Sequence, residues 1–207
     1  MTETRFGTAK CVLPVSINAP VDEVFPLACP VKEYLWIPGW KCNLIHCPNE
    51  RVELGTVFSE LSSAPFLIGS PFGKTTWTAV LHDPQNHKIH FRLENEHSSS
   101  LYRIELEDDG NGRTAGRLDF TYTATTKRGS KLVRRDMEGK LHVMLTVLNA
   151  MLTHYSEHHE MLPSAGIREL VASDQRLALG DKILIGLNRV VRSKVEDENR
   201  SRFVSDS

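Results

Sequence analysis

Hydrophobic and polar residues alternate along the first two thirds of the chain, and this alternation predicts β-strands. Turn-forming residues at 48–50, 83–86 and 109–112 separate several of these segments. Connections this short join antiparallel neighbours. The segments that we expect to be strands are 10–17, 42–47, 56–61, 74–83, 88–95, 99–108 and 113–125.

The alternation also predicts which face of the sheet is buried. One face carries apolar and aromatic residues, while charged residues and threonines occupy the other face. A sheet with one apolar face needs a cover on that face. The residues expected on the buried face include Trp77, Ala79, Leu81, Ile89, Phe91, Leu93, Tyr102, Ile104, Leu106, Leu118, Phe120 and Tyr122.

A helical pattern at residues 130–162 supplies the expected cover. Apolar residues recur there at steps of three and four, and Pro163 is expected to end the helix. A helix of this length can cross a whole curved sheet, since each residue adds about 1.5 Å. We therefore expect an α+β fold. The recurring residues are Val133, Met137, Leu141, Met144, Leu148, Met151, Leu152, Tyr155 and His159.

The segment 30–41 is irregular and unusually aromatic. It contains Trp36 and Trp40 together with Pro38 and Gly39, which break regular structure. It follows the strand 10–17 and a short helix that begins near Pro20. Large aromatic side chains on an irregular backbone typically cover a core end or a pocket mouth. The sequence therefore predicts an apolar cavity with an aromatic lid.

Composition and charge narrow the classes of function. The chain has 207 residues, of which 40% are hydrophobic and 25% charged, as in ordinary globular proteins. A net charge of -1 gives no electrostatic basis for nucleic acid as a partner. The start of the chain has no apolar signal region, so we expect a cytoplasmic protein whose four cysteines are reduced. No apolar run approaches the length of a membrane span, so we expect no stable membrane insertion.

Three segments carry a family resemblance. Residues 15–25 read Val-Ser-Ile-Asn-Ala-Pro-Val-Asp-Glu-Val-Phe, residues 30–40 contain the two tryptophans, and residues 152–155 read Leu-Thr-His-Tyr. With the order of the elements, these segments resemble the SRPBCC superfamily, which includes START lipid-transfer domains, polyketide cyclases and pollen-allergen-like proteins. The resemblance covers residues 5–162 and is nearest to bacterial members of unassigned function.

The resemblance implies a helix-grip fold, in which a curved antiparallel sheet wraps around a long C-terminal helix, with two short helices after the first strand. Members bind lipids, sterols, polyketides or other apolar molecules between sheet and helix. Some members are enzymes, but the superfamily has no shared catalytic motif, so the fold alone does not give the function.

We expect a carrier, sensor or transfer protein for a small apolar or amphipathic molecule. Two alternatives remain open: a cyclase- or aromatase-like enzyme, which needs an acid/base pair inside the cavity, and an interaction module of the chaperone-activator type, which needs an exposed apolar patch and a collapsed cavity. Each candidate ligand-binding residue could instead be plain core. The candidates are Trp36, Trp40, Phe58, Trp77, Phe91, Tyr102, Phe120, Tyr122, Met144, Leu148, Met151 and Tyr155.

Two groupings of potential metal ligands were weighed against simpler interpretations. His154 and His158 enclose the pattern His-x-x-Glu-His, but they lie toward the polar flank of a helix end. On a strand Cys42 and His46 share one face, whereas Cys47 points to the other. We therefore expect no metal, no cofactor and no identifiable catalytic residue.

The tail at 163–207 lies outside the resemblance and is expected to be a helical appendage with a frayed end. A short helix is expected to end near Gly180, and a second carries an apolar stripe from Ile183 to Val191 with basic residues beside it. Three interpretations of the stripe stay open. It docks on its own domain, forms a homodimer or partner surface, or lies on a membrane surface.

Overall fold

The computed structural model describes residues 6–49, 51–61 and 74–173. Seven strands form one antiparallel sheet in the order β1-β7-β6-β5-β4-β3-β2, so β1 and β2 lie at its edges. Pro14 thus lies on an edge strand, where a residue without an N–H is tolerated. The strands are β1 (Thr8–Ile17), β2 (Cys42–His46), β3 (Val57–Leu61), β4 (Lys74–Asp83), β5 (Lys88–Glu94), β6 (Ser98–Asp108) and β7 (Thr114–Ala124).

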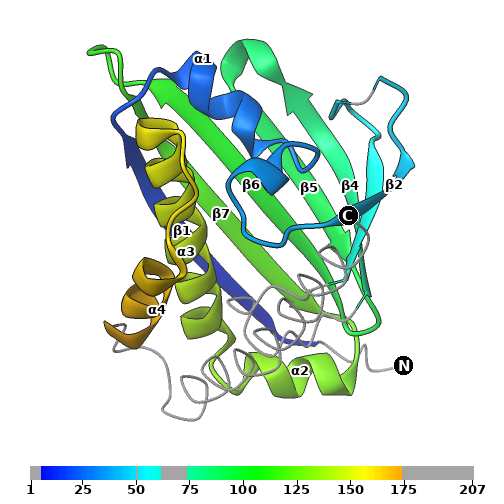
Figure 1. The fold of residues 1–207 in the computed structure, drawn as a ribbon. Helices are drawn as coiled ribbons and strands as arrows, with labels where there is room; N and C mark the ends of the chain where they lie inside the picture. The colour runs from blue at the N-terminus through cyan, green and yellow to red at the C-terminus, as the bar shows by residue number, and fades with distance from the viewer. Residues whose placement is uncertain (1–5, 50, 62–73, 174–207) are drawn as a thin grey trace, which may run out of the picture.

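The helices lie on one face of this curved sheet and at its ends (Figure 1). The longest of them, α3, runs across the concave face, and α4 packs beside it. The expected α+β architecture is therefore confirmed. The helices are α1 (Val21–Val24), α2 (Lys127–Val133), α3 (Met137–His158) and α4 (Ser164–Ser173), with the short 3-10 helices η1 (Phe25–Ala28), η2 (Glu33–Leu35) and η3 (Pro84–Asn86).

The predicted faces of the central strands are confirmed, with two exceptions. The strand register shifts between Ala79 and Leu81, so Leu81 lies opposite His90 and its expected place on the buried face is wrong. Along β5 and β6 buried residues alternate with more exposed ones. The buried residues of β5 are all apolar, whereas those of β6 are Tyr102, Ile104 and Leu106 together with Ser98 and Ser100. Asp119, expected on the wet face, is only 7% exposed. Lys10 Nζ lies 3.1 Å from one of its carboxylate oxygens and Arg103 Nη1 lies 3.3 Å from the other. These long side chains cover Asp119 and pair its charge on the outer face.

The single helix expected at 130–162 is wrong in detail, because two helices occupy this range. The chain breaks at Asp136, whose φ of 77° is left-handed, and α3 starts directly after it. The Asp136 carboxylate accepts a hydrogen bond from the backbone N–H of Gly139 at 3.2 Å. This is an N-cap, which satisfies one of the free donors of the new helix. The apolar spacing continues across the break, so periodicity alone does not reveal it.

The C-terminal end of α3 is also earlier than expected. His159 adopts a left-handed φ of 56° and its N–H bonds to the Tyr155 carbonyl oxygen at 2.8 Å. The helix therefore ends at His158, and four residues separate it from Pro163. The next helix, α4, has its Val171 buried against the core. The boundary between residues 5–162 and 163–207 remains a prediction, and the stripe from Ile183 to Val191 lies outside the described residues.

Two further findings concern the thiols and the helices of the described residues. Cys29 and Cys42 form no disulfide with another described residue. Within the described ranges, no helix combines the length and the apolar character that crossing a bilayer requires.

Candidate functional site

A cavity lies between the concave face of the sheet and α3. The space enclosed by its walls is about 850 Å³ when the part open to solvent is counted. The walls are mainly apolar, but several polar side chains interrupt them. The lining residues are Ala28, Glu33, Trp36, Ile37, Trp40, Glu60, Thr75, Trp77, Leu93, Asn95, Ser100, Tyr102, Ile104, Leu118, Phe120, Met144, Leu148 and Leu152.

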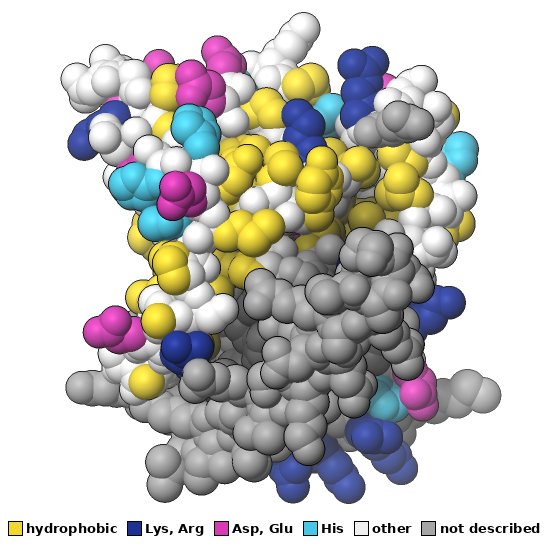
Figure 2. Space-filling view, viewed as in Figure 1, with side chains coloured by type: hydrophobic (Ala, Val, Ile, Leu, Met, Phe, Trp, Pro, Cys, Tyr) yellow, Lys and Arg dark blue, Asp and Glu magenta, His cyan; other side chains and the backbone are white. Residues whose placement is uncertain are grey.

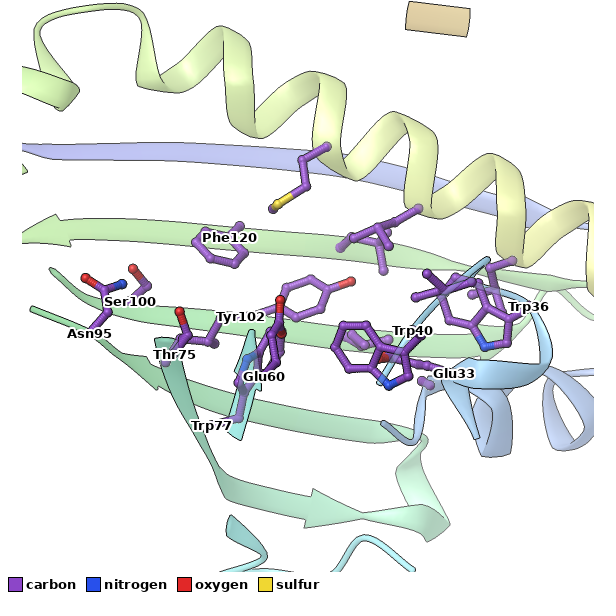
Figure 3. Close-up of a pocket in the computed structure, with 18 residues that line it drawn as sticks. Glu33, Trp36, Trp40, Glu60, Thr75, Trp77, Asn95, Ser100, Tyr102 and Phe120 are labelled. Atoms are coloured by element: carbon purple, nitrogen blue, oxygen red, sulfur yellow. The ribbon is translucent and has the colours of Figure 1, made fainter. Parts of the chain in front are cut away.

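A continuous series of aromatic rings forms one wall of the cavity (Figure 3). The rings of Trp40 and Trp77 meet edge to face, with centroids 6.4 Å apart, and Trp77 meets Tyr102 in the same manner at 6.4 Å. Tyr102 then contacts Phe120 at 5.6 Å. Such contacts hold the rings in fixed orientations, because each aromatic edge is attracted to the face of the next ring. Facing this wall from α3 are Met144, Leu148 and Leu152.

Hydrogen bonds to the backbone hold the aromatic segment 30–41 in place. The indole N–H of Trp36 donates to the Leu27 carbonyl oxygen at 2.9 Å, and that of Trp40 donates to the Pro30 carbonyl oxygen at 2.9 Å. The polar edge of each indole is thus satisfied by protein, while both rings line the cavity. Figure 2 shows hydrophobic side chains gathered over this part of the surface, where Tyr34 is exposed.

The structure brings seven of the twelve candidate binding residues to the cavity wall. The other five belong to the surrounding packing. Phe58 is fully buried behind Trp77, with which it stacks at 5.3 Å, and it also meets Phe91 edge to face at 6.1 Å. Tyr155 contacts the His159 ring near the end of α3. The seven at the wall are Trp36, Trp40, Trp77, Tyr102, Phe120, Met144 and Leu148; the five away from it are Phe58, Phe91, Tyr122, Met151 and Tyr155.

Sequence reasoning missed the polar residues of the cavity. They are Glu33, Glu60, Thr75, Asn95 and Ser100. A signal for four of them was present, because each lies two positions from a residue already assigned to the inward face of its strand. The inward positions next to them are Phe58 for Glu60, Trp77 for Thr75, Leu93 for Asn95 and Tyr102 for Ser100. Glu33 lies inside the aromatic segment itself.

Two of the missed residues are carboxylic acids buried in an apolar wall. Glu33 is 9% exposed and Glu60 is 4% exposed. Burial raises the pKa of Glu60 to about 7, and the indole N–H of Trp77 partly opposes this shift without reaching hydrogen-bonding geometry. Burial, and then the charge of Glu60, raise the pKa of Glu33 well above its usual value. Both carboxyl groups therefore favour the protonated form.

The hydroxyl of Tyr102 belongs to the same electrostatic environment. Burial and the nearby Glu33 carboxyl raise the pKa of Tyr102 far above its usual value. It therefore stays protonated and can donate a hydrogen bond. In Figure 3, Glu60 and Tyr102 lie in the middle of the cavity, Glu33 lies beside Trp40, and Ser100 and Asn95 lie at the opposite end.

The two groups of potential metal ligands, His154 with His158 and Cys42 with His46 and Cys47, do not form a metal site in the structure. The rings of His154 and His158 lie against each other with centroids 4.7 Å apart on successive turns of α3. Cys42 directs its thiol toward the Pro30 carbonyl oxygen, at 3.9 Å. Across residues 6–49, 51–61 and 74–173, no three His, Cys, Asp or Glu side chains converge as a metal site.

Comparison with solved structures identifies the fold. Norcoclaurine synthase from Thalictrum flavum, solved with a transition-state analogue, superposes with a TM-score of 0.56 at 12% identity, over 76% of this chain and 99% of that one. The same enzyme solved with dopamine and hydroxybenzaldehyde gives 0.54 at 14% identity, over 74% and 90%. Major latex-like protein 151 from Panax ginseng gives 0.50 at 14% identity, over 75% and 99%.

The chain has the helix-grip fold of the SRPBCC superfamily. This confirms the resemblance that the sequence suggested, at the level of the fold. No family model matches the sequence, and no curated protein is similar to it in sequence. At these identities the likeness concerns the fold alone, so function has to be argued from the cavity.

Proposed function

We propose that this helix-grip protein binds a small apolar or amphipathic molecule in the cavity between the sheet and α3, as a carrier, sensor or transfer protein. The observation that carries the proposal is the composition of the cavity wall. Its surface is mostly aromatic and aliphatic, as in ligand sites generally. Yet Glu60 Oε2, Trp77 Nε1 and Ser100 Oγ are buried there with no hydrogen-bond partner among the described residues.

Unpartnered polar atoms argue for a ligand rather than for plain core. A buried polar atom without a partner costs about 1–3 kcal/mol, and native proteins keep few of them. Three in one cavity can be satisfied together by one molecule that has polar atoms on an apolar body. The solved complex of norcoclaurine synthase with dopamine and hydroxybenzaldehyde supports the proposal, since a protein of this fold holds small aromatic molecules.

Intrinsic fluorescence offers a direct test, because all three tryptophans of the chain line the cavity. Titration with N-phenylnaphthylamine, an uncharged apolar probe, is expected to change the tryptophan emission and saturate. Leu148→Phe adds a ring to the α3 wall and is expected to weaken binding about tenfold or more through lost space. Leu44→Phe, at an exposed position of β2, is the matched control and is expected to leave the affinity unchanged.

The proposal fails if the folded wild-type protein gives no saturable response with this probe. It also fails if Leu148→Phe and Leu44→Phe bind the probe as tightly as the wild type. Thermal unfolding of both variants checks that each is folded at the temperature of the titration.

A second candidate function, a cyclase- or aromatase-like enzyme, is favoured by one specific observation. The acid/base pair that such an enzyme needs is available in Glu60, whose pKa is raised to about 7, and in the protonated Tyr102. An ionised Glu60 could take a proton from carbon next to a carbonyl group, while Tyr102 donates to the carbonyl oxygen. The interaction-module alternative needs a collapsed cavity, which these residues do not form.

Proton exchange distinguishes the enzyme from the carrier. Acetonaphthone incubated with the protein in deuterated buffer is expected to exchange its methyl protons faster than in buffer alone, as followed by NMR. Glu60→Gln is expected to abolish the acceleration. Exchange at the buffer rate, under conditions where acetonaphthone is bound, would leave the protein as a binder only.

A further inference from the structure

Among the residues that the structure describes, the two carboxyl groups of the cavity have no positively charged partner. Glu33 and Glu60 form no ion pair within residues 6–49, 51–61 and 74–173. The cavity wall formed by these residues also contains no lysine, arginine or histidine. Buried carboxylates in proteins are usually paired, coordinated or protonated, since an isolated charge is poorly solvated there.

The two acids come from separate elements that the fold brings together. Glu33 lies on η2, where its carbonyl oxygen accepts from Trp36 and Ile37 and so closes the turn. Glu60 lies on β3, between Cys42 of β2 and Thr75 of β4 in the strand register. Both carboxyl groups reach the same cavity, and the charge of Glu60 opposes ionisation of Glu33.

Aromatic faces surround these carboxyl groups. Trp40, Trp77 and Tyr102 all line the cavity, and Trp77 lies near Glu60. An ammonium group over such rings is attracted by their negative faces, and the attraction grows when water is excluded. A carboxyl pair within an aromatic wall is therefore complementary to a positively charged group on an apolar body.

We infer that the cavity is selective for a lipophilic amine, whose ammonium group lies between Glu33 and Glu60 and whose apolar body contacts the aromatic wall. This inference rests on the proposed binding function and adds the class of ligand. Ser100, which is 4% exposed and has an unpartnered Oγ, provides an independent contact for a polar atom at the other end of the ligand. The ligand class is thus an amine with a polar substituent on an aromatic or aliphatic body.

Proton transfer on binding is balanced without any further reactant. An amine that enters as the free base takes the proton of the Glu60 carboxyl group, giving an ammonium–carboxylate pair. An amine that enters as the ammonium ion meets an already ionised Glu60 above neutral pH. Glu33 can keep its proton in either case, because burial raises its pKa well above the usual value.

Three naphthalene probes of similar size separate charge from shape. Naphthylethylamine carries a positive charge, naphthylethanol is neutral and naphthylacetate is negative. Tryptophan quenching at about pH 8, with calorimetry as a second readout, is expected to give the tightest binding for the amine and the weakest for the acid. The amine is expected to exceed the alcohol by about ten- to hundredfold, the range for hydrogen bonds to a charged group.

Carboxamide variants test the role of each acid. Glu60→Gln and Glu33→Gln are expected to weaken binding of the amine about tenfold or more, while naphthylethanol binding changes by less than about threefold. Glu94→Gln, at an exposed position on β5, is the matched control and should leave all three affinities unchanged. If both cavity variants bind the amine as the wild type does, the inference is wrong.

A pH series on the unmodified protein keeps the test independent of variant folding. The ratio of amine to alcohol affinity is expected to rise from about pH 5.5 to about pH 8 as Glu60 ionises, while an alkylamine stays protonated throughout. The titratable groups that interact with Glu60 are Glu33 from η2 and the Cys42 thiol from β2. Glu33 in turn interacts with Tyr102 from β6. A ratio that does not change with pH would overturn the inference.

The outcomes for the two proposals are distinct. Saturable binding of naphthylethanol with no preference for the amine refutes the amine inference and leaves the binding function standing. Failure of all three probes to bind the folded protein refutes both.

Discussion

Replacing Glu60 by glutamine should stabilise the protein at neutral and alkaline pH relative to its stability in weak acid. In the folded protein, burial of Glu60 among Trp77, Thr75 and the other cavity residues raises its pKa to about 7, from a usual value of 4.5. Glutamine has nearly the same shape and stays neutral. The variant therefore removes the titration while retaining most of the packing.

The sign follows from where the proton is held. Between pH 4.5 and about 7 the folded state keeps the Glu60 proton, while the unfolded state releases it. The contribution of Glu60 protonation to the free energy of unfolding is complete below pH 4.5, the pKa in the unfolded state. It decreases as the pH rises and is lost above about pH 7, the pKa in the folded state. At 1.36 kcal/mol per pH unit, an interval of about 2.5 units corresponds to about 3 kcal/mol of unfolding free energy.

Urea unfolding at several pH values between about 5 and 8 measures this difference. The free energy of unfolding of Glu60→Gln minus that of the wild type is expected to rise by about 3 kcal/mol across the series. Glu33 also favours its protonated form in the folded state, but its slope is present in both proteins and largely cancels in the difference. Glu94→Gln, exposed on β5, is the control and should run parallel to the wild type.

The reasoning would be refuted by parallel curves for Glu60→Gln and the wild type. A difference that falls as the pH rises would be equally damaging, because it would mean that a charged partner holds Glu60 in the folded protein. If Glu94→Gln shows the same change in the pH dependence of the unfolding free energy, the cause is the net charge of the protein and not the burial of Glu60.

Two further substitutions test how the frame of the cavity is built. Gly116→Ala is expected to lower the free energy of unfolding, measured with urea, by more than about 2 kcal/mol. Gly116 has a φ of 150°, and a Cβ there would collide with the Glu105 carbonyl oxygen of the neighbouring strand. Asp136→Ala should cost about 1–2 kcal/mol through loss of the α3 cap, whereas Asp136→Asn, which can cap and tolerates a left-handed φ, should cost far less in the same measurement.

The sheet was predictable because its two faces differ so clearly in polarity. In β5, in β7 from Leu118 onward and in β6 from Tyr102 onward, apolar and polar residues alternate, and a shift by one residue would expose every apolar side chain. The strand ends were predicted within one or two residues for the same reason. This is why the expected α+β architecture is confirmed.

The break in the long helix was harder to predict, because the apolar residues on either side remain in phase. Val133 and Met137 are four positions apart, as within one helix. The available signal was Asp136 itself, because aspartate is a common N-cap residue of helices. Its carboxylate accepts a hydrogen bond from the backbone N–H of Gly139, three positions later. Local capping overrides the continuous periodicity here.

The cavity itself was predictable only in part, because alternation gives the face of a strand and not the position along it. Phe58, Phe91 and Tyr122 are buried on the expected face of the sheet, yet they do not line the cavity. The polar residues were missed for a related reason: a search for a ligand site that looks only for aromatic side chains skips the carboxyl and hydroxyl groups at the next inward position. Glu60 and Ser100 are the clearest examples.

The buried acids carry the argument from fold to function. Two carboxyl groups with no positive partner among the described residues add nothing to the stability of a core. An apolar side chain of similar volume at Glu60 would remove its desolvation cost. Burial of Glu60 lowers the free energy of unfolding at neutral pH by about 3 kcal/mol. This is a substantial part of the total unfolding free energy of a typical domain, about 5–15 kcal/mol. Such a cost is characteristic of residues retained for a bound state, in which another molecule supplies the missing partner. That reasoning favours a ligand with a hydrogen-bond donor or a positive charge over one that is purely hydrocarbon.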